Sequence, residues 1–404
     1  MRIPRSLPLR FVLARALALG IIVVPRPAPA QASDTNIAAR MARVERNVIA
    51  IAASGADSGP AQTLPQRMAA MKVPGLSVAV FEGGRIVWAG GYGMRDVRDG
   101  SPVDTSTLFQ AASISKPVSA TVMFRLIEQG RLSLDEDVNE KLTSWKVPAS
   151  QFTTVEKVTP RRLVSHMAGT TVSGFAGYAV GDPLPTLAQI LDGLPPANSA
   201  PVRVTNTPGA RESYSGGGVT VLQLMMQDIT GKSFDVLANE LVLAPVGMRR
   251  STFVQPLPAR LAPRAATAYD GNGTAIRGKY HVYPEQSAAG LWTTPSDLAR
   301  FMLAIGRSYR GEQDGILRQA TAREMLTPIP GGSGLGFGLS GAGDALRYRH
   351  TGGNAGFTCY AVAFVGSGRG VVIMSNSDNG TTVIRELGRA VSREFGWPAL
   401  WMRE

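Results

Sequence analysis

The stretch FQAASISKPVSATVMFRLIEQG, Phe109 to Gly130, places a serine and a lysine three residues apart at the start of an apolar periodic segment. Residues three apart share one face of a helix, so Ser113 and Lys116 can bring a hydroxyl and an amine together. Pro117 excludes a regular helix before Ser113, because its ring would clash with the carbonyl four residues earlier. Ser113 would then lie at the positive helix end, which stabilises an oxyanion and destabilises an ammonium. The pair can be a nucleophile with its base; a serine cap beside a solvated lysine would have the same spacing.

A tyrosine that could share the proton transfer follows later in the chain. In PGARESYSGGGVTVLQL, Tyr214 lies just before a predicted helix, in a glycine-rich loop that lets a ligand approach the main chain closely. A phenol near an ammonium can pass protons. A half-buried hydroxyl in a turn is the ordinary structural role of a lone tyrosine.

A third element lies near the C-terminus. The stretch RYRHTGGNAGFTCYAVAFV places His350, Thr351, Gly352 and Gly353 just before an apolar strand. Glycines at such a position let a substrate pair with the strand edge and leave a backbone N–H free for an oxyanion.

Taken in order, these elements resemble those of the serine β-lactamases, D-alanyl-D-alanine peptidases and β-lactamase-like carboxylesterases. The S-x-x-K, Y-x-N and K/H-T-G motifs of that superfamily are matched by Ser113–Lys116, Tyr214-Ser215-Gly216 and His350-Thr351-Gly352. The phrases VPGLSVAVFEGG, LVSHMAG and YPEQSAAGLWTTPSDLARF are similar to the class C-like branch. The resemblance covers about Leu64 to Phe395.

The resemblance implies a serine hydrolase that works through an acyl-enzyme released by water. Ser113 would attack a carbonyl, Lys116 and Tyr214 would remove its proton, and Tyr214 would return a proton to the leaving group. Which of the two is the base stays open, because coupled groups titrate as a pair. The Ser113 N–H would contribute to the oxyanion hole, and the substrate- and oxyanion-binding residues would be His350, Thr351, Gly352 and Gly353. No metal or organic cofactor is implied.

Two departures from the motifs bear on the substrate. Gly216 replaces the asparagine whose amide, in β-lactamases, helps to hold the lysine and the substrate's acylamide group. His350 replaces a lysine, so the fixed charge that would meet a substrate carboxylate becomes titratable. Both favour a small-molecule ester as substrate. The alternatives are a β-lactamase or D-alanyl-D-alanine carboxypeptidase, and a catalytically idle penicillin- or cell-wall-binding protein.

The elements that must position these residues indicate an α/β (α+β) fold. The stretch GLSVAVFEGGRIVWAGGYG predicts a hairpin, and two more strands are predicted in CYAVAFVGSGRGVVIMSN. Helices are predicted over Ile37–Ala53, Ser115–Gln129 and Thr382–Phe395. We therefore expect a central antiparallel sheet, built from distant segments and flanked by helices, with a mostly helical subdomain inserted over about 132–250.

The N-terminus predicts export. Arg2, Arg5 and Arg10 precede the mainly apolar Phe11–Val24, and small-residue cleavage sites follow up to Ala32. The apolar run is too short to span a bilayer, which disfavours a membrane anchor. We predict a signal peptide over 1–32, an N-terminal helix and linker over 33–63, and a hydrolase domain over 64–404. The mature protein would be periplasmic or secreted, with no stable membrane span; its oligomeric state is left open.

Other signals are assigned structural roles. The formal net charge of +12 contains no basic run with interleaved aromatic residues, which disfavours nucleic-acid binding. His166 is predicted to cap a helix end and His281 is a candidate for lining the cleft, but the three histidines lack metal-ligand spacing. Ser77 lies within a predicted strand rather than at a nucleophile elbow. Cys359 is predicted to be a small buried residue.

Overall fold

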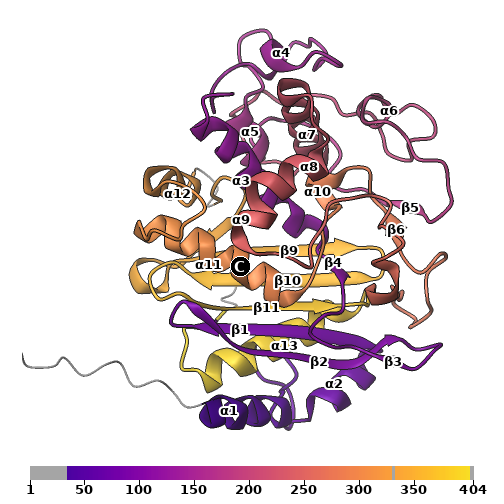
Figure 1. Ribbon diagram of the computed structural model, residues 1–404, viewed down its shortest axis with the longest axis vertical. Coiled ribbons are helices and arrows are strands. Elements are labelled where there is room, and N and C mark those ends of the chain that lie inside the picture. Colours follow the sequence, from indigo (N-terminus) through magenta and orange to yellow (C-terminus); the bar gives the residue numbers. More distant parts are fainter. Residues whose placement is uncertain (1–33, 330–332, 401–404) are drawn as a thin grey trace, which may run out of the picture. The chain divides into compact units, whose positions relative to one another are not determined.

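The computed structural model describes residues 34–329 and 333–400, so the leader predicted over 1–32 lies outside the described residues (Figure 1). Within them, seven strands form a sheet in the order β3-β2-β1-β11-β10-β9-β8. All of its pairings are antiparallel. The N-terminal hairpin therefore joins the C-terminal strands, as predicted. The strands are β1 Gly75–Glu82, β2 Arg85–Asp96, β3 Ser101–Pro102, β8 Gly338–Ser340, β9 Arg347–Asn354, β10 Phe357–Phe364 and β11 Arg369–Ser375.

Helices cover both faces of this sheet, which explains why its central strands are almost continuously apolar. On one face lies α11 (Pro295–Arg310) and on the other α13 (Gly380–Glu394). Side chains alternate accordingly: Ala79 enters the core on the α11 side, whereas Val78 and Val80 enter the core on the α13 side.

The N-terminal segment packs on α13. Helix α1 (Asp34–Arg46) ends earlier than predicted, because Val48 and Ile51 form β-bridges with Gln62 and Asp57 instead of continuing the helix. The predicted linker is thereby closed into a loop. Helix α2 (Leu64–Ala70) follows it and also packs against α13.

The middle of the chain holds the predicted helices, but long irregular segments separate them. Helix boundaries follow the expected signals: Thr159 caps the helix that begins at Pro160, and Gly231 ends α7 with a φ of 70°. The region also contributes β5 (Tyr178–Ala179), which pairs with β6 (His281–Val282). Its helices are α4 Val138–Lys141, α5 Pro160–Val164, α6 Leu187–Asp192, α7 Gly216–Thr230, α8 Phe234–Ala238 and α9 Ala244–Val246, with a π-helical turn at Asn239–Leu243.

Helix α3 (Ser115–Glu128) connects the helical region to the sheet and is buried along most of its length. The remaining short elements are β4 Phe109–Gln110, β7 Trp292–Thr293, α10 Gln286–Ala289, α12 Gln319–Met325 and the 3₁₀ turns Ala112–Ile114, Ala262–Arg264 and Gly343–Ala345. In the described part of the chain, no helix combines the length and apolar character needed to cross a bilayer.

Candidate active site

Ser113 and Lys116 are in direct contact at the start of α3. Lys116 Nζ donates to Ser113 Oγ over 3.0 Å and to the Ala288 carbonyl over 2.9 Å. The lysine is only 4% exposed, whereas the serine is half-buried. Ala112, just before the serine, has a φ of 49°, a strained value for a residue with a side chain. The amine is thus fixed beside a hydroxyl that solvent and substrate can reach.

The Ala288 carbonyl belongs to α10, which buried hydrogen bonds hold between two longer helices. Ser119 of α3 donates to the Ser287 carbonyl over 2.9 Å. On the other side, the Ser287 amide donates to Gln223 Oε1 and its hydroxyl to the Val219 carbonyl, each over 2.9 Å. Helix α10 therefore forms a rigid platform for the lysine.

Glu285, at the N-terminus of α10, is an unusual member of this platform. It is 0% exposed, and neither carboxyl oxygen has a hydrogen-bond partner among the described residues. Burial raises its pKa to about 7, because a carboxylate without partners is disfavoured away from water. The neutral acid is therefore the favoured form below neutral pH.

Tyr214 completes the group from the turn before α7. Lys116 Nζ lies 5.0 Å from the centroid of its ring. The ring centroids of His350 and His166 lie 6.4 and 4.3 Å from that of Tyr214. At 41% exposure, the phenol remains accessible to a substrate. The S-x-x-K pair, Tyr214 and His350 thus come together from α3, the α7 turn and β9.

Strand β9 presents an open edge beside Ser113. Its turn into β10 has two residues, so Asn354 and Phe357 form a hydrogen-bonded pair, and Gly353 directs its N–H away from β10. Because β8 pairs with β9 only as far as Arg349, no described strand covers this N–H. Gly352 lets β9 approach the serine loop: a Cβ there would lie 2.3 Å from the Ala111 carbonyl oxygen. Gly353 is therefore geometrically available as an oxyanion donor.

His350 is half-buried at the same edge. Its Nδ1 lies 2.5 Å from the Thr351 carbonyl oxygen, which can only accept, so Nδ1 carries a proton. Burial, together with the neighbouring Lys116 charge, lowers the pKa of His350 to about 4. At neutral pH the imidazole is uncharged, unlike the lysine of the K-T-G form of the motif.

Gly216, which stands in the place of the motif asparagine, lies against Phe175. A Cβ on Gly216 would lie 3.1 Å from Phe175 Cε2 and 3.2 Å from the Ser173 carbonyl oxygen. The half-buried phenylalanine thus adjoins the space in which an asparagine side chain would begin. An aromatic ring therefore lies beside the position where the motif would place an amide.

A hollow of about 160 Å³ adjoins Tyr214 and His350. It contains both a positive and a negative side chain, Arg349 and Glu212, and Ser333 donates to Glu212 over 2.9 Å. The remaining lining residues are Val164, His166, Gly334, Gly336, Phe337, Gly338 and Thr351.

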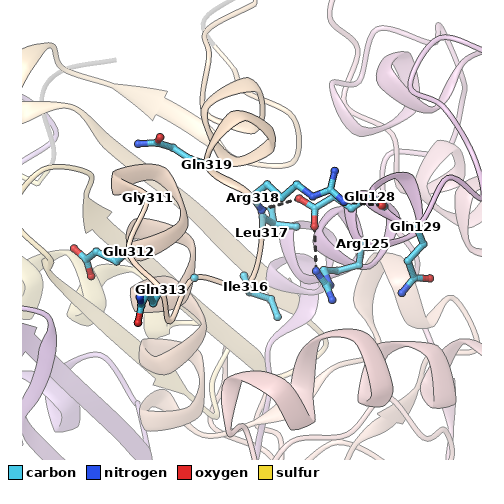
Figure 2. A pocket seen from close by; sticks show the side chains of 11 residues that line it. Arg125, Glu128, Gln129, Gly311, Glu312, Gln313, Ile316, Leu317, Arg318 and Gln319 are labelled. Carbon is cyan, nitrogen blue, oxygen red and sulfur yellow. Dashed lines mark hydrogen bonds and ion pairs between the residues drawn. The ribbon is translucent and has the colours of Figure 1, made fainter.

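A larger hollow of about 480 Å³ lies toward the C-terminal end of α3 (Figure 2). Along a helix, Arg125 is about 14 Å from Lys116. The Glu128 carboxylate in this hollow accepts from Arg125 Nη1 over 3.0 Å and from the Arg318 amide over 2.7 Å. Its lining contains no serine, cysteine, lysine or histidine, so we do not assign it a catalytic role.

The structure also shows the surroundings of the four residues that were not assigned to the catalytic motifs: His166, His281, Cys359 and Ser77. The prediction for His166 is wrong in detail: its Nδ1 accepts from the Ser215 amide over 3.2 Å instead of capping its own helix. His281 Nδ1 lies 2.8 Å from the Ala176 carbonyl oxygen, beside the loop that carries Phe175. Cys359 is buried, as predicted, and Ser77 donates to the Gly90 carbonyl within the hairpin.

Sequence reasoning missed three contributors to the site. The Ala288 carbonyl left no signal, because any residue supplies a carbonyl. Phe175 lies in an irregular loop without periodicity. His166 was predicted only to cap a helix end, because nothing in its sequence position indicates a contact with the turn that carries Tyr214. Among the described residues, no group of three or more His, Cys, Asp or Glu side chains could hold a metal ion.

Comparison with known proteins gives consistent matches. A family model described as Beta-lactamase matches residues 61–392. Penicillin-binding protein 4 of Amycolatopsis lactamdurans is 25% identical, over 80% of this chain and 86% of that protein. Esterase EstB of Burkholderia gladioli is 27% identical, over 69% and 77% respectively. The structure of D-alanine carboxypeptidase AmpC from Burkholderia cenocepacia has a TM-score of 0.66 at 18% identity, covering 87% of this chain and 99% of that one.

Proposed function

The chain belongs to the beta-lactamase family and is a serine hydrolase, and from that premise we propose that it hydrolyses carboxylic esters with a neutral, apolar acyl group. The predicted leader supports an exported enzyme that acts in the periplasm or outside the cell. The substrate is a small molecule.

In the proposed mechanism, Ser113 attacks the ester carbonyl while Lys116 and Tyr214 take up its proton. The Ser113 Oγ to Lys116 Nζ contact of 3.0 Å supports this transfer. The backbone N–H groups of Ser113 and Gly353 stabilise the oxyanion. Tyr214 protonates the departing alcohol, and water then releases the acid from Ser113.

The observation that carries the choice of substrate is the contact between Gly216 and Phe175. An acylamide side chain would need a hydrogen-bonding partner in the site, because a buried amide without one is costly. Here the motif amide is missing and an aromatic ring lies beside its place. That arrangement suits an acyl group with nothing to hydrogen-bond. EstB, one of the relatives, is named an esterase.

Arg349 favours a second candidate, a β-lactamase or D-alanyl-D-alanine carboxypeptidase. Arg349 lines the hollow beside Tyr214, and an arginine there could meet a substrate carboxylate. Glu212 in the same hollow opposes an anion, and His350 is neutral. A catalytically idle binder is disfavoured because a protein that only binds has no need of Ser113, Lys116 and Tyr214 together.

The test is turnover of p-nitrophenyl acyl esters, nitrocefin and a D-Ala-D-Ala peptide by the wild-type enzyme and by Ser113→Ala. We expect hydrolysis of the esters, with kcat reduced at least about a thousandfold in Ser113→Ala because the nucleophile is lost. Ser173→Ala removes an exposed hydroxyl in the loop that carries Phe175 and serves as the matched control.

Ester turnover that survives in Ser113→Ala would refute the mechanism. Faster turnover of nitrocefin or peptide than of any ester would favour the second candidate. Stoichiometric labelling by penicillin without any turnover would identify a binder.

A further inference from the structure

We propose that His166 is a positioning residue for Tyr214, which it holds through the amides of both neighbouring residues and through its ring. The inference rests on the proposed function, in which Tyr214 transfers protons. It gives a role in the reaction to a histidine that lies outside the three motifs.

The main-chain contacts enclose the tyrosine on both sides. The Ser213 amide donates to the His166 carbonyl over 2.7 Å, and the Ser215 amide donates to His166 Nδ1 over 3.2 Å. The amides of both residues that flank Tyr214 are thus tied to one residue. Because these bonds fix the turn at two points, they limit the rotation of the Tyr214 backbone.

The imidazole ring also supports the phenol directly. Its centroid lies 4.3 Å from that of Tyr214, with 42° between the ring planes. His166 itself is buried, whereas Tyr214 is 41% exposed. The phenol therefore rests on a fixed ring on one side and faces the cleft on the other.

The protonation state of His166 fits this role. Burial, together with the neighbouring Lys116 charge, lowers its pKa to about 3. The ring is therefore neutral at neutral pH, and Nδ1 keeps the lone pair that accepts from Ser215. Protonation would place an N–H against the Ser215 N–H and break the contact.

The backbone of His166 allows a matched pair of substitutions. Its φ of 59° is in the left-handed region, which glycine and asparagine adopt more easily than other residues. Asparagine places an acceptor oxygen where the imidazole has Nδ1, whereas glycine provides no acceptor and no ring. His166→Asn and His166→Gly therefore differ in support for Tyr214 while sparing the backbone conformation.

The experiment measures kcat and KM for p-nitrophenyl and simple alkyl esters with these two variants, Tyr214→Phe, and the double variant Tyr214→Phe/His166→Gly. We expect His166→Gly to lower kcat about tenfold or more, with KM changed less than about threefold. The loss should be greater for alkyl esters, whose poor leaving groups need the proton from Tyr214. His166→Asn should recover most of the activity. In the double variant, the glycine should have little further effect.

The results separate the two proposals. Unchanged activity of Tyr214→Phe would refute the proposed mechanism, whatever His166 does. If Tyr214→Phe is impaired but His166→Gly is not, or if their effects simply multiply, the positioning role is overturned. Lys72→Gly replaces another left-handed residue, with a φ of 53°, on the surface after α2, and should leave activity unchanged. Thermal unfolding of every variant identifies any loss that comes from misfolding.

Discussion

At the scale of single residues, the proposed ester specificity assigns selection of the acyl group to Phe175. Its ring adjoins Gly216, at the motif position where an asparagine would otherwise offer an amide. An apolar contact of this kind gains free energy in proportion to the acyl surface that it removes from water. Selectivity should therefore grow with the length of the acyl chain.

We predict that Phe175→Ala raises KM for p-nitrophenyl hexanoate about tenfold and leaves p-nitrophenyl acetate nearly unchanged. The removed ring can no longer cover the longer chain, a loss equivalent to one or two buried methylenes, about 1.4 kcal/mol. Steady-state kinetics across an acyl series would measure the trend. Val155→Ala, at a highly exposed position, is the control. Equal losses for acetate and hexanoate would show that Phe175 does not contact the acyl chain.

At the scale of elements, α10 shows how a very short helix can position the amine of the proposed Ser113–Lys116 pair. Its Ala288 carbonyl holds Lys116, and hydrogen bonds from α3 and α7 hold α10. The unpartnered Glu285 at its start is the weak point of this arrangement. The charge state of that carboxyl should therefore influence stability.

We predict that the wild type loses stability as pH rises because Glu285 ionises, and that Glu285→Gln abolishes this loss. The folded pKa of about 7 lies above the ordinary value of 4.5. Between these two values the folded state retains a proton that the unfolded state releases. The stabilisation from this proton is fully present below about pH 4.5 and is lost as pH rises through about 7. Relative to wild type, the variant should gain about 2 to 3 kcal/mol between pH 5 and pH 8.

Urea denaturation of both proteins at several pH values measures this difference. Comparing them cancels the opposite contribution of His350 and His166, whose lowered pKa values make the fold more stable as pH rises from about 3 to 6.5. Glu140→Gln, at an exposed position of α4, is the control. A stability difference that does not change with pH would contradict the assignment.

The same scale shows what the sequence could and could not predict. The starts of α5 and α11 were predictable, because Thr-Pro pairs cap helices locally, and so was the proximity of Ser113 and Lys116. The sequence does not predict that α10 holds Lys116. Its role depends on main-chain carbonyls and on contacts with helices far away in the sequence, which no local pattern encodes.

At the scale of the whole molecule, residues 34–70 close the sheet on the side of α13. The apolar spacing of Ile37, Met41 and Val44 predicted a helix, but not its partner, since packing between distant segments has no sequence period. A buried ion pair joins α2 to α13: Arg67 donates to Glu386 through Nε over 2.9 Å and through Nη2 over 2.7 Å. This pair fixes the register between the N-terminal segment and the last helix.

We predict that Glu386→Gln lowers the free energy of unfolding by about 3 kcal/mol, because it leaves the buried Arg67 charge without its counter-charge. Replacing both partners, as in Arg67→Met/Glu386→Leu, should recover most of that loss, because no charge is then left uncompensated. The exposed pair of Arg393 with Asp57 joins the same two parts of the chain, so Asp57→Asn is the matched control, expected to cost less than about 1 kcal/mol. Urea denaturation measures all three. If Asp57→Asn lowers the free energy of unfolding as much as Glu386→Gln does, the junction as a whole rather than the buried charge determines stability. If the double variant is less stable than Glu386→Gln, the ion pair itself is net stabilising.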